Sequence, residues 1–209
     1  MSQQTSIVFI VDDDISVRES LEALIRHEGL NVEAFESAEA FLARPRPVIP
    51  GCLILDVFLP QLSGLDLQQH IAADRTSMPI IFLTGHGDVP STVRAMKAGA
   101  AEFLTKPFDD EVLLAAIRNA IARSGVALDE EAELRALRER FVSLSRRERE
   151  VMTLVVRGLL NKQVGGKLGI TEITVKAHRG RVMEKMHAKT FADLVNMGLR
   201  LSIAPDART

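Results

Sequence analysis

Short apolar runs alternate with longer amphipathic segments five times in the first 123 residues, and this alternation limits the possible folds more than any other feature. Apolar runs bounded by turn residues predict buried strands, and the segments between them have helical spacing. Strands are expected at 7–11, 31–35, 52–55, 79–83 and 102–104. Helices are expected at 16–29, 38–43, 64–73 and 89–100, with a fifth from Asp109 or Asp110. Five strand–helix units predict a doubly wound parallel sheet with helices on both faces.

After residue 144 only helices are expected. Four of them are predicted, at 146–158, 161–169, 171–186 and 190–201. Between the two regions we expect a helical linker in which Leu134, Leu137, Phe141 and Leu144 have heptad spacing. Two interpretations of this seam stay open: a short coiled coil, or packing against the chain's own domains. The predicted domains are therefore 1–123, a linker at 124–143, and 144–209.

Charge separates the same regions. Residues 1–123 carry 10 basic and 17 acidic side chains, a net of −7, and the linker has a net of −2. Residues 144–209 carry 13 basic and 6 acidic side chains, a net of +7, which favours a polyanionic partner for that part. The sequence contains no apolar run long enough to span a membrane, no signal-peptide pattern, and a single cysteine, Cys52. These features predict a cytoplasmic protein that does not bind membranes.

Polar residues follow four predicted strands. Asp12 and Asp13 follow the first, Asp56 ends the third, Thr84 follows the fourth, and Lys106 lies just beyond the fifth. Ligands of doubly wound sheets bind at the carboxyl ends of the strands, so these side chains are expected at one site. A single Asp after a strand is more often a turn or helix cap, and Asp14 is expected to be one.

An ionised Asp56 at the end of a buried strand needs a compensating charge. Clustered carboxylates repel one another, and Mg²⁺ or Mn²⁺ removes that repulsion. A metal on one side and the Lys106 ammonium on the other would leave Asp56 available as a nucleophile toward a phosphoryl group. Thr84 would add a hydroxyl donor, and Lys106 is expected to pair with Asp56 when no phosphoryl group is bound.

The motifs "VDDDISVRESL", "LILDVFLP" and "LTGHGDVPSTVRAMKAGAAEFLTKPF" resemble the receiver domain of two-component response regulators, in particular the FixJ subgroup. The resemblance implies a flavodoxin-like fold and phosphorylation of Asp56 by a sensor histidine kinase. It implies that Mg²⁺ or Mn²⁺ is held by Asp12, Asp13, Asp56 and the backbone carbonyl of Phe58. It also implies a cis Lys106–Pro107 bond.

The resemblance further implies that Thr84 and Phe103 form a switch pair, in which Phe103 turns inward as Thr84 approaches the phosphoryl group. Composition alone favours a plain core position for Phe103, and both interpretations stay open.

The basic region contains a helix-turn-helix pattern. A short helix, "NKQVGGKL", is followed by Gly169 for the turn, by the N-cap Thr171, and by a longer helix. That helix is expected to bury Val175, Val182 and Met186 together with His178 or Arg179. Its opposite face is expected to carry Lys176, Arg179 and Lys185, and a helix of this kind enters the major groove of DNA.

The stretch "LSRREREVMTLVVRGLLNKQVGGKLGITEITVKAHRGRVMEKM" resembles the LuxR/NarL-type DNA-binding domain. The resemblance implies DNA contact by the second helix, at Lys176, Ala177, His178, Gly180 and Arg181. It gives Glu148 and Arg149 a structural role. Gly165 and Gly166 depart from the family pattern and are expected to loosen their helix.

Together these observations predict a transcription regulator, phosphorylated at Asp56, that binds promoter DNA and forms a homodimer when phosphorylated. RNA polymerase is a further candidate partner. Arg94 and Lys97 are the expected dimer contacts. The only chemistry expected of the chain is its own Mg²⁺-dependent phosphoryl transfer and dephosphorylation.

Three other classes of protein fit the sequence less well. An aspartyl-phosphate phosphatase would carry a second acid two residues after the nucleophile, where this chain has Phe58. A small-molecule-sensing LuxR regulator would lack the acidic pocket. A receiver acting only by protein contact would not need the basic helix-turn-helix.

Overall fold

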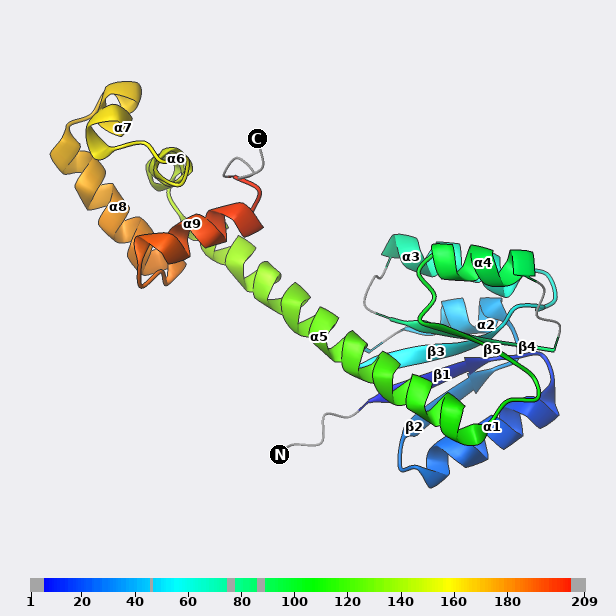
Figure 1. Cartoon of the computed structure of the whole chain (residues 1–209). Coiled ribbons are helices and arrows are strands. Elements are labelled where there is room, and N and C mark those ends of the chain that lie inside the picture. Colours follow the sequence, from blue (N-terminus) through cyan, green and yellow to red (C-terminus); the bar gives the residue numbers. More distant parts are fainter. Residues whose placement is uncertain (1–5, 46, 75–77, 86–88, 204–209) are drawn as a thin grey trace. The chain divides into compact units, whose positions relative to one another are not determined.

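A computed structural model describes residues 6–45, 47–74, 78–85 and 89–203. The chain divides into two compact units, Met1–Asp129 and Glu130–Thr209. The long helix α5, Asp110–Ser143, belongs to both units in sequence (Figure 1).

The first unit is built on a five-stranded parallel sheet with the strand order β2-β1-β3-β4-β5. The strands are β1 (Ile7–Val11), β2 (Asn31–Phe35), β3 (Gly51–Asp56), β4 (Ile80–Thr84) and β5 (Glu102–Thr105). The predicted doubly wound parallel sheet is confirmed, with each strand within one residue of its expected position. The three central strands β1, β3 and β4 are buried throughout, as their continuous apolar runs indicate.

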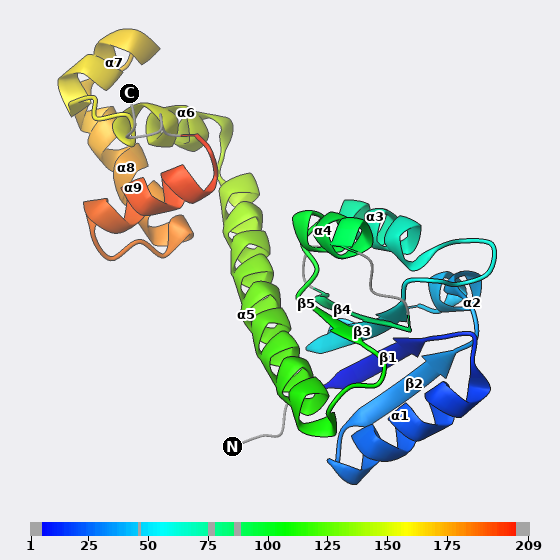
Figure 2. The ribbon, with the colours of Figure 1, turned by 45° about the vertical axis from the view of Figure 1, so that its right-hand side comes forward.

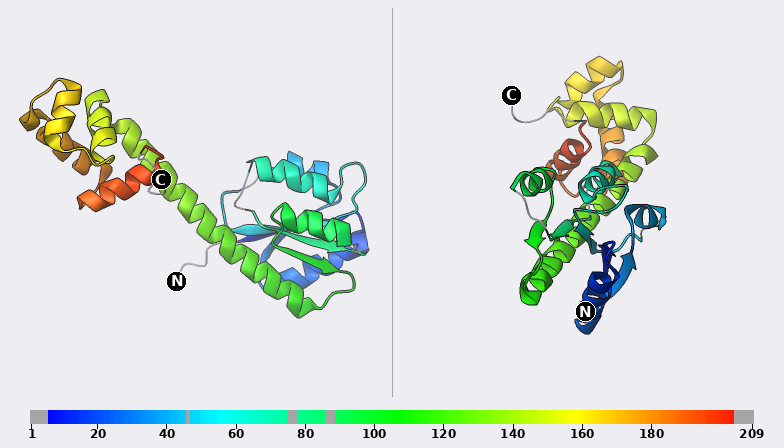
Figure 3. Two further views of the ribbon diagram at one scale, coloured as in Figure 1. Left: turned by 45° about the horizontal axis from the view of Figure 1, so that its top comes forward. Right: turned by 90° about the vertical axis from the view of Figure 1, so that its right-hand side faces the viewer.

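Helices cover both faces of this sheet. The described helices of the first unit are α1 (Ile15–His27), α2 (Ala38–Ala43), α3 (Gly64–Asp74), α4 (Val89–Lys97) and the first part of α5. One face packs against α1 and α5, where Leu21, Ile25, Leu113 and Ile117 join the core. The other face packs against α2, α3 and α4 (Figures 1 and 3).

Helix α4 ends three residues earlier than the sequence predicts. Gly99 adopts a left-handed φ of 89°, and the amide of Ala100 donates back to the carbonyl of Ala95 at 3.1 Å. This closing turn stops the helix at Lys97, because a glycine in the left-handed region satisfies the last carbonyls without a Cβ clash.

The described part of the second unit, residues 130–203, has helices as its only regular elements. They are the end of α5, α6 (Arg146–Val155), α7 (Asn161–Leu168), α8 (Glu172–Met186) and α9 (Phe191–Arg200). Helix α8 lies beside α6, α7 and α9, and its buried residues Val175, Val182 and Met186 form the centre of the core (Figure 2).

The seam on α5 belongs to this core. Leu137 and Leu144 are 4% and 2% exposed, and Leu134 and Phe141 pack against the same cluster. Of the two interpretations of the heptad spacing, packing against the chain's own domain is therefore the one that the structure supports. The described parts of the chain contain no helix long and apolar enough to cross a membrane.

Candidate functional site

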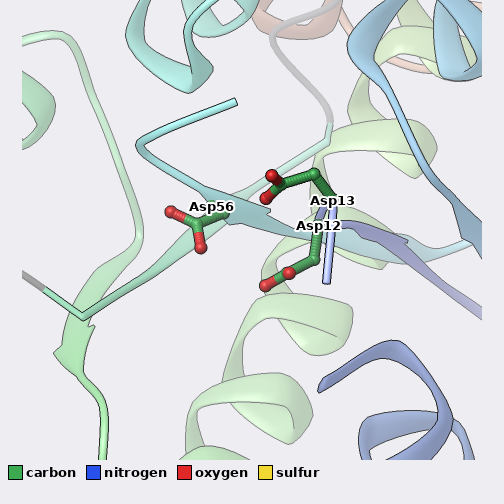
Figure 4. A group of neighbouring side chains, drawn as sticks. All are labelled: Asp12, Asp13 and Asp56. Atoms are coloured by element: carbon green, nitrogen blue, oxygen red, sulfur yellow. The ribbon is translucent and has the colours of Figure 1, made fainter. Parts of the chain in front are cut away.

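The predicted acidic site forms at the carboxyl edge of the first unit's sheet. Asp12 directly follows β1, Asp56 is the last residue of β3, and Lys106 directly follows β5. Because the strands are parallel, these ends lie at one edge. Figure 4 shows Asp12, Asp13 and Asp56 as neighbours at this edge. Asp12 and Asp56 are only 2% and 8% exposed, whereas Asp13 is exposed. Asp14 caps α1, as expected, by accepting the amide of Ser16 at 2.8 Å.

The Lys106 ammonium compensates both buried carboxylates. Its Nζ atom donates to Oδ2 of Asp56 at 2.8 Å and to Oδ2 of Asp12 at 2.6 Å. The pairing with Asp56 was predicted from the sequence, and the structure adds the shorter contact with Asp12. The other carboxylate oxygens also have donors: the amide of Asp14 on Asp12 at 3.0 Å, and the amide of Phe58 on Asp56 at 2.9 Å.

Burial and pairing set the protonation of this group. Burial raises the pKa of Asp12, and the hydrogen bonds from Lys106 and Asp14 only partly oppose that shift. For Lys106, burial lowers the pKa, but the hydrogen bonds to Asp12 and Asp56 together outweigh it, so the pKa is raised. Lys106 therefore remains an ammonium ion at neutral pH.

Three carboxylates of this edge suit a divalent metal ion. One oxygen from each of Asp12, Asp13 and Asp56 lies within 4.8 Å of the others. The set consists of hard oxygen donors, two of them buried and one open to solvent, which matches the preference of Mg²⁺ for a few carboxylates plus water. The amide contact with Asp56 places the main chain of Phe58 beside this group.

Two residues that the sequence analysis did not single out fix the main chain here. Nη1 of Arg18, on α1, donates to the carbonyl of Asp12 at 2.7 Å. A Cβ atom at Gly64 would lie 2.1 Å from the carbonyl of Asp56, so only glycine allows α3 to start this close to the site. Contacts with main-chain atoms far away in the sequence leave no periodic pattern of residue types. For Gly64 the one available signal is the turn pattern "SGLD" after Pro60.

Thr84 and Phe103 lie on neighbouring strands. Thr84 is fully buried at the end of β4, and Phe103 is half-buried on β5, with its ring 6.0 Å from that of Phe82. The register places Phe103 opposite Phe82 and Thr105 opposite Thr84. Residues two apart point to the same face, so Thr84 and Phe103 are diagonal neighbours on the face covered by α4. The implied cis Lys106–Pro107 bond is present.

A second candidate site is the helix-turn-helix of the second unit. Gly169 ends α7 with a left-handed φ of 65°, and Thr171 caps α8 by accepting the amide of Thr174 at 3.2 Å. The two glycines of α7 differ. A Cβ atom at Gly165 would lie 2.7 Å from the carbonyl of Ile170, whereas one at Gly166 would meet nothing within 4 Å. Gly165 thus permits the tight turn between the helices.

Most of the expected DNA contacts lie on the exposed part of α8. Lys176, Ala177, Gly180 and Arg181 are exposed, whereas His178 is half-buried. The Nδ1 atom of His178 is buried and has no hydrogen-bond partner among the residues the structure describes.

Two of the three cations expected on the exposed face have partners on other elements of this unit, and for one of them, Arg179, the buried stripe was the open alternative. Arg179 is half-buried, donates to Asn161 at 3.3 Å, and stacks 4.4 Å from the centre of the Phe191 ring. Lys185 donates to Glu148 at 2.7 Å. Both cations therefore hold α8 against its neighbours, Arg179 half-buried and Lys185 exposed, whereas Lys176 pairs within α8, with Glu172.

Glu148 anchors the start of the second unit. It is 3% exposed, forms a capping box with Ser145, and accepts from Lys185. The hydrogen bond from Lys185, together with that from the Ser145 amide, lowers the pKa of Glu148 to about 2. Arg149 is exposed, and its side chain has no hydrogen bond or ion pair within the described chain, so the expected locking role holds for Glu148 only.

Comparison with known families matches both units. The family described as "Response regulator receiver domain" matches residues 8–118, and the family described as "Bacterial regulatory proteins, luxR family" matches residues 142–198.

Several curated and solved proteins are similar to this chain over most of its length. Nodulation protein W of Bradyrhizobium diazoefficiens is 51% identical over 199 residues, covering 95% of this chain and 88% of its own. Transcriptional regulatory protein FixJ of Azorhizobium caulinodans is 44% identical, covering 95% and 94%. Among solved structures, the response regulator StyR matches with a TM-score of 0.81 and 45% identity, covering 94% of this chain and 99% of its own.

Proposed function

Because the chain belongs to the NarL/FixJ-type response regulators, with a receiver domain and a LuxR-type DNA-binding domain, we propose that Asp56 is its phospho-acceptor. The observation that carries the proposal is the position of the Asp56 carboxylate, at the carboxyl edge of the sheet between two further acids and the Lys106 ammonium. Such clusters of carboxylates with one paired cation suit phosphoryl transfer more than they suit fold stability.

Each side chain of this edge has a role in the proposed reaction. An Asp56 oxygen forms the bond to phosphorus as the bond from phosphorus to the kinase histidine breaks, which leaves an acyl phosphate. Lys106 turns from the carboxylates to the phosphoryl oxygens, and the Thr84 hydroxyl donates to one of them. Asp12, Asp13, Asp56 and the carbonyl of Phe58 would hold Mg²⁺ or Mn²⁺, which supplies positive charge for the phosphoryl oxygens.

The acyl phosphate shifts an equilibrium between two conformations of the receiver. Thr84 and Phe103 share one face of the sheet, so movement of Thr84 toward the phosphoryl group opens space for the Phe103 ring to turn inward. Helix α4 and β5 border this pair, and we propose that their surface, including Arg94 and Lys97, forms the homodimer contact of the phosphorylated protein.

The second unit delivers the response on promoter DNA. We propose that α8 enters the major groove with Lys176, Ala177, His178, Gly180 and Arg181 at the interface. The proposed working parts are a receiver at 1–123, a linker at 124–143 and a DNA-binding domain at 144–209. The protein would act in the cytoplasm, where a sensor kinase and RNA polymerase are both accessible, and would turn over no substrate other than its own phosphoryl group.

Phosphoryl uptake tests the assignment of Asp56. The full-length chain is incubated with a small phosphodonor and Mg²⁺, and its intact mass is measured. We expect one added phosphoryl group, none in Asp56→Asn, and none after Mg²⁺ is chelated. Asp110→Asn, which removes an exposed acid at the start of α5, is the matched control and should be labelled normally. Normal labelling of Asp56→Asn would refute the assignment.

A further inference from the structure

The first turn of α8 carries an unusually exposed apolar side chain. Ile173 is 80% exposed, more than any other large hydrophobic residue in the described chain. Single exposed apolar residues are common on protein surfaces, so this exposure alone indicates no function. The residues around Ile173 on the helix, however, do indicate a function for it.

Ile173 lies on the free face of the helix. Ile173, Ala177 and Gly180 are spaced by four and three residues and share a face, opposite the buried Val175 and Val182. Ala177 and Gly180 are small, and a Cβ atom at Gly180 would meet nothing within 4 Å. This face is therefore a strip of small residues that another molecule can approach closely. The branched apolar side chain of Ile173 projects from its N-terminal end.

The charged side chains beside this strip indicate which half of it can lie against DNA. The exposed cations Lys176 and Arg181 flank it, and Lys176 forms an exposed pair with Glu172 at 3.4 Å, which solvent weakens. The exposed Glu184 lies three residues beyond Arg181, in the C-terminal part of the helix, and would repel phosphates there. The acid of the N-terminal half, Glu172, is paired with Lys176, so this half, with Ile173, is the half that can enter the groove.

We propose that Ile173 is a specificity-determining residue that reads thymine through its 5-methyl group. The inference rests on the proposed role of α8 as the recognition helix. In the major groove thymine alone presents a methyl group, and an aliphatic side chain is the complementary contact. N-terminal residues of recognition helices are the ones that reach base edges. Ile173 has no polar atom in its side chain and cannot read a base by hydrogen bonding.

Replacing thymine by deoxyuridine tests this directly, since it removes only the methyl group. High-affinity duplexes are selected from a random pool with the full-length chain, treated with a phosphodonor and Mg²⁺. Each thymine of a selected duplex is then replaced in turn, and binding is titrated. A homodimer binds two similar half-sites of the duplex. In each half-site, at one or more thymine positions, the replacement should weaken binding about fourfold, which corresponds to the free energy of burying one methyl group.

Variants connect that loss to Ile173. Ile173→Ala should bind the thymine and deoxyuridine duplexes equally at this position, while the control Val142→Ala, a 71% exposed side chain of α5, should keep the fourfold ratio. If Ile173→Ala binds too weakly for titration, Ile173→Val must show a reduced ratio. A fourfold ratio retained in the Ile173 variants, or no thymine position sensitive to the replacement, overturns the inference but leaves DNA binding intact. Absence of salt-sensitive binding to every duplex would instead overturn the proposed function.

Discussion

Glu148→Gln should destabilise the second unit by an amount that the structure allows us to bound. The substitution keeps the size of the side chain and its acceptor for the Ser145 amide, but removes the charge that faces Lys185 at 2.7 Å. The pKa of Glu148 is about 2 in the folded protein, against an ordinary value of 4.5. Multiplied by the free energy per pKa unit, this shift corresponds to about 3 kcal/mol.

Solvent reduces that figure. The Lys185 side chain is 41% exposed, so water screens its attraction to Glu148 and can hydrate the ammonium ion when the partner is lost. We therefore expect Glu148→Gln to lower the free energy of unfolding at pH 7 by about 1 to 3 kcal/mol. The control Glu184→Gln removes an exposed charge from α8 beside Lys185, and should change the stability by less than about 0.5 kcal/mol.

The same pair predicts a pH dependence. A depressed carboxyl pKa stabilises the fold fully above its ordinary value, and the stabilisation is lost as the pH falls toward the folded value. The difference between the parent and Glu148→Gln should thus be constant above about pH 5, shrink between 4.5 and about 2, and vanish below that range.

Urea unfolding of residues 130–209, followed by far-UV circular dichroism, measures both effects. The chain has no tryptophan or tyrosine, so intrinsic fluorescence is not a usable signal. The fragment begins at 130 because Leu134, Leu137 and Phe141 belong to the core of this unit. A Glu148→Gln loss equal to that of Glu184→Gln, or a difference at pH 2 as large as that at pH 7, would refute this account of the pair.

Other changes have equally definite outcomes. Lys106→Met should slow phosphoryl uptake at least tenfold, by intact mass, yet tighten Mg²⁺ binding by calorimetry, because no ammonium then competes for the carboxylates. Thr84→Ala should still take up phosphate but respond weakly in a DNA-binding titration; a normal response would exclude the switch role. Lys176→Ala should cost about 1–3 kcal/mol on a specific site; an equal loss on all duplexes would make it a phosphate contact. In thermal unfolding, Gly165→Ala should destabilise by about 1–3 kcal/mol through its clash with Ile170, whereas Gly166→Ala should stabilise by up to about 1 kcal/mol.

The receiver unit could be predicted from the sequence to within a few residues because its signals are local. Each buried strand is a continuous apolar run, and each polar residue at a strand end reaches the same edge once the sheet is parallel. The pairing of Lys106 with Asp56 followed from the need to compensate a buried charge. The contact of Lys106 with Asp12 could not be predicted in this way. A flexible ammonium group can approach either of two nearby acids, and the distances that decide between them are set by the fold.

The contacts of Arg18 and Gly64 show what such local signals leave out. Arg18 acts through the carbonyl of Asp12, and Gly64 through the space beside the carbonyl of Asp56. Both interactions use main-chain atoms, which every residue has, so no pattern of side chains marks them. The end of α4 was misplaced for a related reason: the alanines around Gly99 favour helix, and the left-handed turn at the glycine overrides them.

On α8 the sequence does not show which charged side chains face solvent and which contact neighbouring elements. Lysine and arginine on an amphipathic helix are ordinarily assigned to the solvent face; Lys185 was, and Arg179 was assigned either there or to the buried stripe. Yet Arg179 lies four residues after the buried Val175, and Lys185 directly precedes the buried Met186, so both border the core-facing stripe. There they find partners that the sequence separates widely: Asn161 and Phe191 for Arg179, and Glu148 for Lys185. Once these two cations hold the helix in place, the face left for DNA is less basic and more apolar than expected. Its discrimination between bases must then depend more on shape and methyl contacts than on charge, which makes Ile173 and the small residues beside it the positions where specificity should change.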